Sequence, residues 1–361
     1  VRANATGPQT GGSWENALHH LEPVILLAQH YGVLEVWVAE GTYPAQFEFV
    51  SNLVMFGGFA GNETSLDERV IGEHETILDG SNAMGEEPAT HVVTMDNIRN
   101  CLLDGFTVTG GYASGSGANQ NGAGIYVYNS DASSTIINCD FTGNTASTGA
   151  GAYLSYSSVH FENCRFLLNE ASYSGGGVYV SSSQSYESAL FHNCIFGGND
   201  AQYGGGIYVY APYDQNSPDG DALAMSVRGA KSGDSRATGT GAEFRNCMIT
   251  ENTASSQGGG GYVNSESIFQ GCTIADNWSS SGGGLYTNSE PVVYNSIIWG
   301  NTPNSIVTGS TSPIVSFSDI EGSFPGTGNI DSDPLFVDGL HGYYYLSHTG
   351  AGQSQTSPCI D

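Results

Sequence analysis

Basic residues are scarce in this sequence. Its 361 residues include 8 Lys and Arg against 36 Asp and Glu, which gives a formal charge of −28, and Lys231 is the only lysine. A protein that binds nucleic acid needs a basic surface that displaces counterions from the phosphates. The composition therefore excludes nucleic-acid binding.

Long apolar runs are absent as well. Stretches such as residues 33–39 are far shorter than the roughly 18 residues that cross a bilayer, so a membrane-spanning chain is excluded. The sequence begins at Val1 without a basic-then-apolar leader, which indicates either that a signal peptide has been removed or that the sequence is a fragment, and we favour a secreted protein. An acidic composition favours solubility outside the cell. We therefore expect an extracellular protein, either secreted or attached to a cell surface.

Glycine, in contrast, is abundant, with 51 residues, about twice its usual share of roughly 7%. Many glycines belong to a unit that recurs every 24 to 30 residues where no insertion intervenes. Most copies contain a cysteine, an apolar residue two positions later and an asparagine five positions later, followed by a glycine cluster and a short apolar strand. The repeated cysteines are Cys101, Cys139, Cys164, Cys194, Cys247 and Cys272, and Ser296 replaces cysteine in a seventh copy.

A unit of this size, made of short apolar strands and Gly/Asn turns, cannot bury its own apolar face. It can bury that face against identical neighbours stacked above and below it. Helical repeats are excluded because no copy contains an apolar stripe with a period of 3.6 residues. The repeat therefore predicts a parallel β-helix with about three strands in each coil.

An asparagine directly precedes five of the six repeated cysteines. The residue three positions before each cysteine is apolar, so the chain must bend between that residue and the cysteine if both point inward. Asparagine adopts left-handed backbone more readily than most residues. We predict that this asparagine marks one corner of each coil and that the asparagine five positions after the cysteine marks the next.

The same geometry bears on the thiols. Cysteines on successive coils point in the same direction from parallel strands, which is a poor arrangement for the dihedral angle of a disulfide. Cysteine is also readily buried as a small apolar residue. We predict a ladder of free thiols in the core, with disulfides or a metal site as the less favoured alternatives.

Three regions are expected along the chain. Residues 1–32 form an N-terminal cap, residues 33–345 form the β-helix, and residues 346–361 form a C-terminal tail. A Gly/Ser/Asp-rich loop at residues 212–241 is inserted in the β-helix. Cys359 lies outside the repeat and has no predicted role.

The cap contains an amphipathic pattern. It predicts a helix with Ser13 as its N-cap that ends at Gly32 and covers the first coil. An uncovered coil end would expose strand edges and apolar side chains. The first strands are expected at residues 33–39, 47–59 and 76–78.

The repeats have a recognisable relative. Segments such as Phe141-Thr-Gly-Asn144 and Phe166-Leu-Leu-Asn169, each followed by a glycine cluster, resemble the Phe-x-x-Asn and Gly-Gly-Ala-Ile repeats of the polymorphic outer membrane protein family. The ends of the chain, including Asp333-Pro-Leu-Phe336, look like those of secreted bacterial right-handed β-helix surface proteins. The resemblance implies an all-β fold, a single-stranded right-handed parallel β-helix, and a role as an adhesin or surface protein.

A tyrosine lies in the middle of the strand after each glycine cluster. Its aliphatic neighbours point inward, so the tyrosines point outward and could form a platform for sugar rings or a partner protein. The alternative is that these rings only stack on one another or lie under the loop at 212–241. The candidate binding residues are Tyr126, Tyr153, Tyr179, Tyr208, Tyr262 and Tyr286.

Catalytic candidates are few. A β-helix lyase needs a base, and the loop offers Lys231, Arg228 and Arg236, although solvated loop charges are the favoured interpretation. Hydrolysis of a glycoside by two carboxylates remains open, but no spacing in the sequence singles out a pair.

No cofactor is expected except a possible calcium ion, because carboxylates are plausible oxygen donors that here form no full calcium-loop motif. The weak calcium candidates are Asp219, Asp221, Asp331 and Asp333.

Two functions follow from these observations. The first is a non-enzymatic structural or adhesive protein that binds other copies of itself, forming a filament or surface layer, or binds cell-surface glycans. The alternative is a secreted polysaccharide lyase or glycoside hydrolase that acts on a neutral or weakly charged glycan, since a strongly acidic surface repels polyanions.

Overall fold

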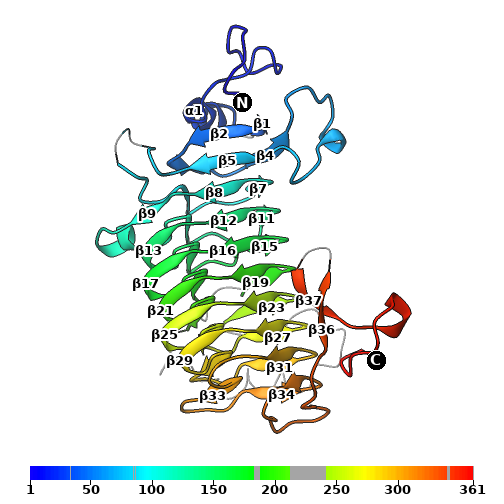
Figure 1. The fold of residues 1–361 in the computed structure, drawn as a ribbon. Coiled ribbons are helices and arrows are strands. Elements are labelled where there is room, and N and C mark those ends of the chain that lie inside the picture. Colours follow the sequence, from blue (N-terminus) through cyan, green and yellow to red (C-terminus); the bar gives the residue numbers. More distant parts are fainter. Residues whose placement is uncertain are drawn as a thin grey trace.

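The computed structural model of the chain describes residues 1–360 except 33, 84, 86, 183–187, 212–240 and 340–341. Short parallel strands are stacked into an elongated body that begins beside helix α1 (Glu22–Tyr31) and continues to strands β33 and β34 at the opposite end (Figure 1). The predicted parallel β-helix is confirmed. Among the described residues, no helix is long and apolar enough to cross a membrane.

Each regular coil contributes one strand to each of four parallel sheets, which we name A, B, D and C in the order in which the chain visits them.

Sheet A contains β1 (Leu34–Ala39), β4 (Leu53–Phe59), β7 (Leu102–Asp104), β11 (Thr135–Ile137), β15 (His160–Glu162), β19 (Ala189–His192), β23 (Ala242–Arg245), β27 (Ile268–Gln270), β31 (Val292–Tyr294) and β34 (Ile314–Ser316). Sheet B contains β2 (Gly41–Pro44), β5 (Thr76–Asp79), β8 (Thr107–Thr109), β12 (Asp140–Thr142), β16 (Arg165–Leu167), β20 (Ile195–Gly197), β24 (Met248–Thr250), β28 (Thr273–Ala275), β32 (Ile297–Trp299) and β35 (Asp319–Ile320).

Sheet D contains β9 (Tyr112–Ala113), β13 (Thr145–Thr148), β17 (Glu170–Ser174), β21 (Asp200–Tyr203), β25 (Thr253–Gln257) and β29 (Trp278–Ser281). Sheet C contains β3 (Phe47–Glu48), β6 (Val93–Asp96), β10 (Ile125–Tyr128), β14 (Ala152–Ser155), β18 (Val178–Ser181), β22 (Ile207–Tyr210), β26 (Gly261–Asn264), β30 (Leu285–Thr287) and β33 (Ile306–Thr308). Three short 3₁₀ helices lie outside the sheets: η1 (Leu66–Glu68), η2 (Gly117–Gln120) and η3 (Thr349–Ala351).

Sheet D makes a fourth strand in the regular coils, where the repeat predicted three. Its strands are short and polar, and the inward residues are small, such as Ala146, Ala171 and Ala201. Side chains of this size leave little apolar signal in the sequence. Sheet D therefore lies over a thin alanine layer, while the phenylalanines and aliphatic residues of the other sheets fill the main core.

The corner asparagines are confirmed. Asn138, Asn163 and Asn193 each have φ of 53°, in the left-handed region that asparagine tolerates. The asparagine five positions after each cysteine has another role. Asn169 and Asn199 are buried, and the left-handed residue of that corner is the one before them, such as Leu168 or Gly198.

These buried asparagines form a hydrogen-bonded ladder along the axis. The Asn199 Nδ2 group donates to Asn252 Oδ1 at 2.9 Å and to the Phe166 carbonyl at 2.8 Å. The Asn199 Oδ1 atom accepts from the backbone and side-chain N–H groups of Asn169, both at 3.0 Å. The ladder satisfies backbone groups at the bend that would otherwise be buried without partners.

The predicted ladder of free thiols is also confirmed. All seven cysteines are free, and the six that belong to the repeat are buried. The thiol of Cys194 donates to the Phe161 carbonyl of the preceding coil at 3.6 Å. Ser296 continues the column, because its hydroxyl accepts from the backbone N–H of Cys272 at 3.1 Å. Cys359 is partly buried, and its thiol donates to Asp319 Oδ2 at 2.9 Å.

The N-terminal helix differs from its predicted start. Ser13 lies in a turn, where its hydroxyl accepts from the backbone N–H of Asn16, and α1 begins only at Glu22. A helix starting at Ser13 would carry Pro23 in its interior, where proline removes a hydrogen bond and clashes with the preceding turn. The predicted end is correct, since Gly32 has φ of 79°.

The helix covers the first coil, because Val24 and Ala28 join the core formed by the first strands.

The parallel stack ends with β35 at Ile320, earlier than the expected boundary at residue 345. Beyond it, β36 (Phe336–Gly339) and β37 (Gly342–Leu346) form an antiparallel hairpin. The Tyr344 hydroxyl on this hairpin donates to Asp276 Oδ2 at 2.9 Å. The hairpin therefore folds back against earlier coils (Figure 1).

Candidate functional site

The outer face of sheet D carries one continuous row of chemically distinctive side chains. The row follows the register of the sheet, in which each member pairs with the next one along the axis. Its members are Tyr112, Thr145, Glu170, Asp200, Thr253 and Trp278. The next residue on each strand is a buried alanine or serine, so alternation along the strand directs the row outward.

Two carboxylates lie next to each other in the middle of this row. Glu170 on β17 pairs directly with Asp200 on β21, and both side chains are exposed. Adjacent strands are about 4.8 Å apart, so the two acids project side by side. Partial burial and the charge of Glu170 raise the pKa of Asp200. A pair of neighbouring carboxyl groups, one of which is held protonated to a higher pH than usual, is suited to acid–base chemistry.

Exposed aromatic rings lie at the two ends of the row. Tyr112 is 49% exposed and Trp278 is 48% exposed. Five strand spacings separate them, which amounts to about 24 Å. A pocket of about 330 Å³ opens beside Tyr112, and its walls include Gln120 and Ser172. Exposed aromatic rings of this kind offer large apolar faces to a ligand.

The sequence itself contains a signal for this row. Each member from Thr145 onward directly follows the buried asparagine of its repeat, as in Asn169-Glu170 and Asn199-Asp200. Aligning the repeats at that position would have placed the two acids in one column. Tyr112 belongs to an irregular early coil and could not have been found in this way.

The predicted tyrosine column lies on the outer face of sheet C, where its members are partly buried. Successive rings stack face to face with centroid separations of 5.5, 5.1, 5.1, 4.8 and 5.3 Å from Tyr126 to Tyr286. The faces of the interior rings are therefore in contact with neighbouring tyrosines. A ligand at this column would meet ring edges and hydroxyl groups, so the predicted stacking of sugar rings could not use the interior ring faces. A binding role for the column stays a prediction.

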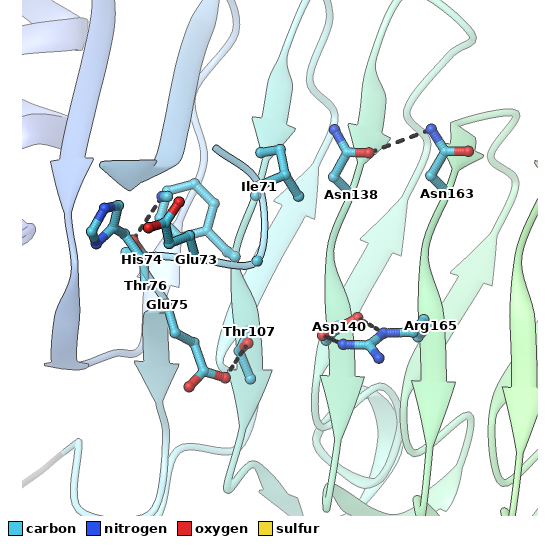
Figure 2. A pocket seen from close by; sticks show the side chains of 14 residues that line it. Ile71, Glu73, His74, Glu75, Thr76, Thr107, Asn138, Asp140, Asn163 and Arg165 are labelled. Carbon is cyan, nitrogen blue, oxygen red and sulfur yellow. Dashed lines mark hydrogen bonds and ion pairs between the residues drawn. The ribbon is translucent and has the colours of Figure 1, made fainter. Parts of the chain in front are cut away.

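A second pocket, of about 500 Å³, lies over the first strands of sheet B. Figure 2 shows Asp140 and Arg165 facing each other on neighbouring strands, and Asn138 linked to Asn163 at the edge. The Arg165 Nε group donates to Asp140 Oδ1 at 2.6 Å, and this contact raises the pKa of Arg165. An arginine held protonated in this way is poorly suited to act as a base.

The opposite wall of that pocket carries further charged groups. The His74 ring is 2.9 Å from Glu40 Oε2, and this hydrogen bond raises the pKa of His74. The Thr107 hydroxyl donates to Glu75 at 3.1 Å (Figure 2). Four charged groups of this pocket thus each have a polar partner, whereas the two acids on sheet D lie beside each other as like charges. The four are His74, Glu75, Asp140 and Arg165.

Several predicted site residues lie outside the described residues, as does nearly all of the loop at 212–241. They are Arg228, Lys231, Arg236, Asp219 and Asp221.

The remaining calcium candidates have local partners. Asp331 accepts from the Ser323 hydroxyl at 2.8 Å, and Asp333 accepts from the backbone N–H of Leu335 at 2.8 Å. In the described part of the chain, no group of three or more His, Cys, Asp or Glu side chains is arranged to hold a metal ion.

Comparison with known proteins supports the fold. Residues 77–222 match the family described as "Right handed beta helix region". The fold is therefore an all-β, right-handed parallel β-helix with a short N-terminal helix, as predicted. This match gives no support for the predicted resemblance to the polymorphic outer membrane protein family. No curated protein matches the sequence.

Solved structures with a similar fold share little sequence. The tailspike protein of Acinetobacter baumannii bacteriophage Fri1, a capsular polysaccharide depolymerase, is 14% identical with a TM-score of 0.43, and the alignment covers 86% of this chain and 52% of the tailspike. The chain thus spans about half the length of that protein. The pectin methylesterase of Aspergillus niger is 13% identical with a TM-score of 0.41, and the alignment covers 86% of this chain and 81% of the esterase.

The tailspike of E. coli bacteriophage HK620, solved with a bound pentasaccharide, is 12% identical with a TM-score of 0.35 over 86% of this chain and 62% of the tailspike. These proteins act on or bind glycans. This finding goes against the expectation of a non-enzymatic structural or adhesive protein and favours the alternative of a glycan-acting enzyme. The predicted filament or surface layer is not shown. At this level of similarity the likeness extends only to the fold, so a function has to be argued from the residues of this chain.

Proposed function

We propose that this protein is an extracellular glycoside hydrolase whose catalytic residues are Glu170 and Asp200. The observation that carries the proposal is their pairing in one outward row of sheet D, between exposed aromatic rings. A rigid parallel sheet supports both acids, as a catalytic constellation requires. The fold alone would not distinguish an enzyme from a binding protein.

The separation of the two acids favours one stereochemical course. Retaining glycosidases hold their two carboxyl groups roughly 5 Å apart, whereas inverting enzymes need roughly 6.5–9.5 Å to admit a water molecule. Side chains in register on adjacent strands project about 4.8 Å apart. The pair therefore fits retention of configuration at the anomeric carbon.

We assign the role of general acid to Asp200, because partial burial and the charge of Glu170 raise its pKa and so favour its protonated form. Asp200 protonates the glycosidic oxygen as its bond to the anomeric carbon breaks, and the Glu170 carboxylate attacks that carbon to form a glycosyl ester. A water molecule then gives a proton to Asp200 and its oxygen to the anomeric carbon, which releases Glu170. Each group returns to its starting state.

The substrate is expected to be a neutral or weakly charged polysaccharide. The row contains two acids and no basic residue, and the whole chain carries a formal charge of −28. Both would repel a polyanion. Tyr112 and Trp278 can stack on sugar rings on either side of the acids. A polysaccharide substrate also supports the expectation that the protein acts outside the cell, as its acidic composition does.

The test measures release of reducing sugars from a panel of neutral polysaccharides by the wild type and by the Glu170→Gln and Asp200→Asn variants. Each substitution should lower turnover by about 10²–10⁴ while circular dichroism stays unchanged. Glu162→Gln is the matched control, because Glu162 is an acid on the outer face of sheet A, and it should retain full activity.

Full activity in both sheet D variants would remove the pair from the mechanism. Products with a new carbon–carbon double bond would instead indicate a lyase.

A further inference from the structure

A groove lies at the end of the molecule opposite β33 and β34, between the N-terminal segment, α1 and the first coil. These elements are at the top of Figure 1. The volume of the groove is about 860 Å³, compared with about 500 Å³ for the pocket over sheet B. None of its residues belongs to the proposed hydrolase site. The groove therefore requires a separate explanation.

Aromatic side chains form part of its wall and are held in place by their neighbours. Trp37 stacks on Phe59 with ring centroids 4.8 Å apart and an angle of 11° between the planes. Trp14 lies 6.2 Å from Trp37 at an angle of 43°, and its indole N–H donates to the Glu63 carbonyl at 2.9 Å. Tyr31 at the end of α1 also lines the groove and is 68% exposed. The rings are thus positioned before any ligand arrives.

The charged side chains of the groove are all acidic: Glu15, Glu35 and Glu63 line it, without a lysine, arginine or histidine. The α-amino group of Val1 also lines the groove and donates to the Trp37 carbonyl, and burial lowers its pKa to about 6, so it is largely neutral above that pH. The carboxylate of Glu63 is already bound by three backbone N–H groups, at 2.6, 2.9 and 2.9 Å. Glu35 accepts one hydrogen bond from the Trp37 indole at 2.7 Å, and Glu15 is exposed. Glu15 and Glu35 therefore supply negative charge beside the aromatic rings.

Aliphatic side chains complete the site. Leu18, Val24 and Leu27 line the same groove. Aromatic faces attract cations through the negative potential of the ring, and quaternary ammonium groups are recognised in this way. The carboxylates add attraction for a positive charge, and aliphatic walls accommodate methyl groups without competing hydrogen-bond donors.

We propose that this groove binds a quaternary ammonium group with an aliphatic or hydroxyalkyl substituent. A neutral sugar could stack on the aromatic rings, but the negative charge of the groove would add nothing to its affinity. A primary ammonium would lose hydration that the apolar wall cannot replace. The combination of tryptophans, the carboxylates of Glu15 and Glu35 and aliphatic side chains therefore favours a methylated cation.

The test uses choline and its uncharged isostere dimethylbutanol, in which a carbon atom replaces the ammonium nitrogen. Binding to the wild-type chain is measured by calorimetry and by tryptophan fluorescence. Choline should bind at least about tenfold more tightly than the isostere. Equal affinity for the two compounds, or no binding of choline, overturns the proposal without any variant being made.

Substitutions then assign the site. Trp37→Leu should weaken choline binding about tenfold or more by removing the cation–π contact, and Glu35→Gln should weaken it less and in a salt-dependent manner. Trp278→Leu is the matched control, because Trp278 lies on sheet D, and it should leave choline binding unchanged. A loss of choline binding in Trp278→Leu that equals the loss in Trp37→Leu would remove the ligand from this groove.

A separate experiment asks which kind of molecule carries the quaternary ammonium group. Sedimentation of the protein with phosphatidylcholine vesicles would indicate a lipid headgroup, whereas binding of free choline alone would indicate a soluble or glycan-linked cation. Hydrolase activity on sheet D should be the same with and without choline. The two proposals can therefore fail independently.

Discussion

Asp200 and Glu170 occupy the same register position on adjacent strands of sheet D. The pairing places two acids from repeats 30 residues apart side by side. Since burial and the charge of Glu170 both raise the pKa of Asp200, Glu170→Gln should lower that pKa. The shift can be measured by NMR titration of the Asp200 carboxyl carbon.

The same coupling affects stability. A carboxyl group whose pKa is raised by folding stabilises the native state while it is protonated. This contribution is complete below the unfolded value and is lost as the pH rises through the folded value. In Glu170→Gln, the stability that is lost as the pH rises through the pKa of Asp200 should be smaller than in the wild type. An unchanged Asp200 titration in the variant would mean that the two carboxyl groups do not interact.

The buried asparagine ladder predicts a second measurable effect. Asn199→Ala removes side-chain contacts to both neighbouring coils, and it takes away the Oδ1 acceptor of the Asn169 backbone N–H and the Nδ2 donor to the Phe166 carbonyl. Asn252 Oδ1 keeps the backbone N–H of residue 199 as a donor. The expected loss of stability is about 2–4 kcal/mol, measured by urea denaturation. Asn193→Ala is the control, because Asn193 is an exposed corner residue. This substitution should lower the stability by about 1–2 kcal/mol, because alanine tolerates the left-handed backbone at residue 193 less well than asparagine does.

The thiol ladder predicts resistance to modification. Burial raises the pKa of the Cys139 thiol to about 12, and the thiolate is the reactive form. In the native protein the six ladder cysteines should not react with iodoacetamide, while all seven should react in guanidinium chloride. Mass spectrometry of the labelled protein gives the count at each cysteine. Rapid labelling of Cys139, Cys164 or Cys194 under native conditions would contradict a closed core.

The tyrosine column on sheet C should contribute to stability through stacking. Tyr208 stacks on Tyr179 at 5.1 Å and on Tyr262 at 4.8 Å. Tyr208→Ala removes both contacts and should cost about 1–3 kcal/mol beyond the lost burial. Tyr208→Phe preserves them and should be nearly neutral in thermal denaturation. If Tyr208→Phe instead weakens glycan binding at unchanged stability, the column contributes to recognition through its hydroxyl groups.

The sequence predicted the fold because its repeat expresses the geometry of one coil. Cys139, Asn138 and Phe141 recur at fixed spacing since each must point inward, bend or pack at the same place in every coil. The strands of sheet D could not be predicted, because segments such as Ala146-Ser147 lack the alternation of apolar and polar residues that indicates a strand. The predicted start of α1 is wrong because Ser13 is a suitable cap by residue type, whereas Pro23 disfavours the interior of a helix that begins there.

The candidate site was only partly accessible from the sequence. The acids Glu170 and Asp200 were present in one repeat column, but their pairing depends on the register of strands that the sequence did not reveal. Contacts such as that of Tyr344 with Asp276 join residues 68 positions apart, outside the repeat. Periodicity describes neighbouring coils, so it carries no information about such irregular contacts.

The aromatic end of the row predicts a separation of binding from catalysis. Trp278 lies two strands from Asp200 along the row, with Thr253 between them. Trp278→Ala should raise KM about tenfold by removing a stacking surface, while kcat stays within about threefold because the acids are untouched. Steady-state kinetics on oligosaccharides of increasing length measures both constants. The effect should be absent with substrates too short to reach Trp278.

Phe317→Ala is the matched control for this experiment, since Phe317 is also a well-exposed aromatic residue but lies at the corner between β34 and β35. Its removal should leave KM unchanged for every substrate. If Trp278→Ala lowers kcat and leaves KM unchanged, the tryptophan acts on the transition state rather than on ground-state binding. If neither constant changes, the glycan does not extend along the row toward β29, and its path must leave sheet D after Asp200.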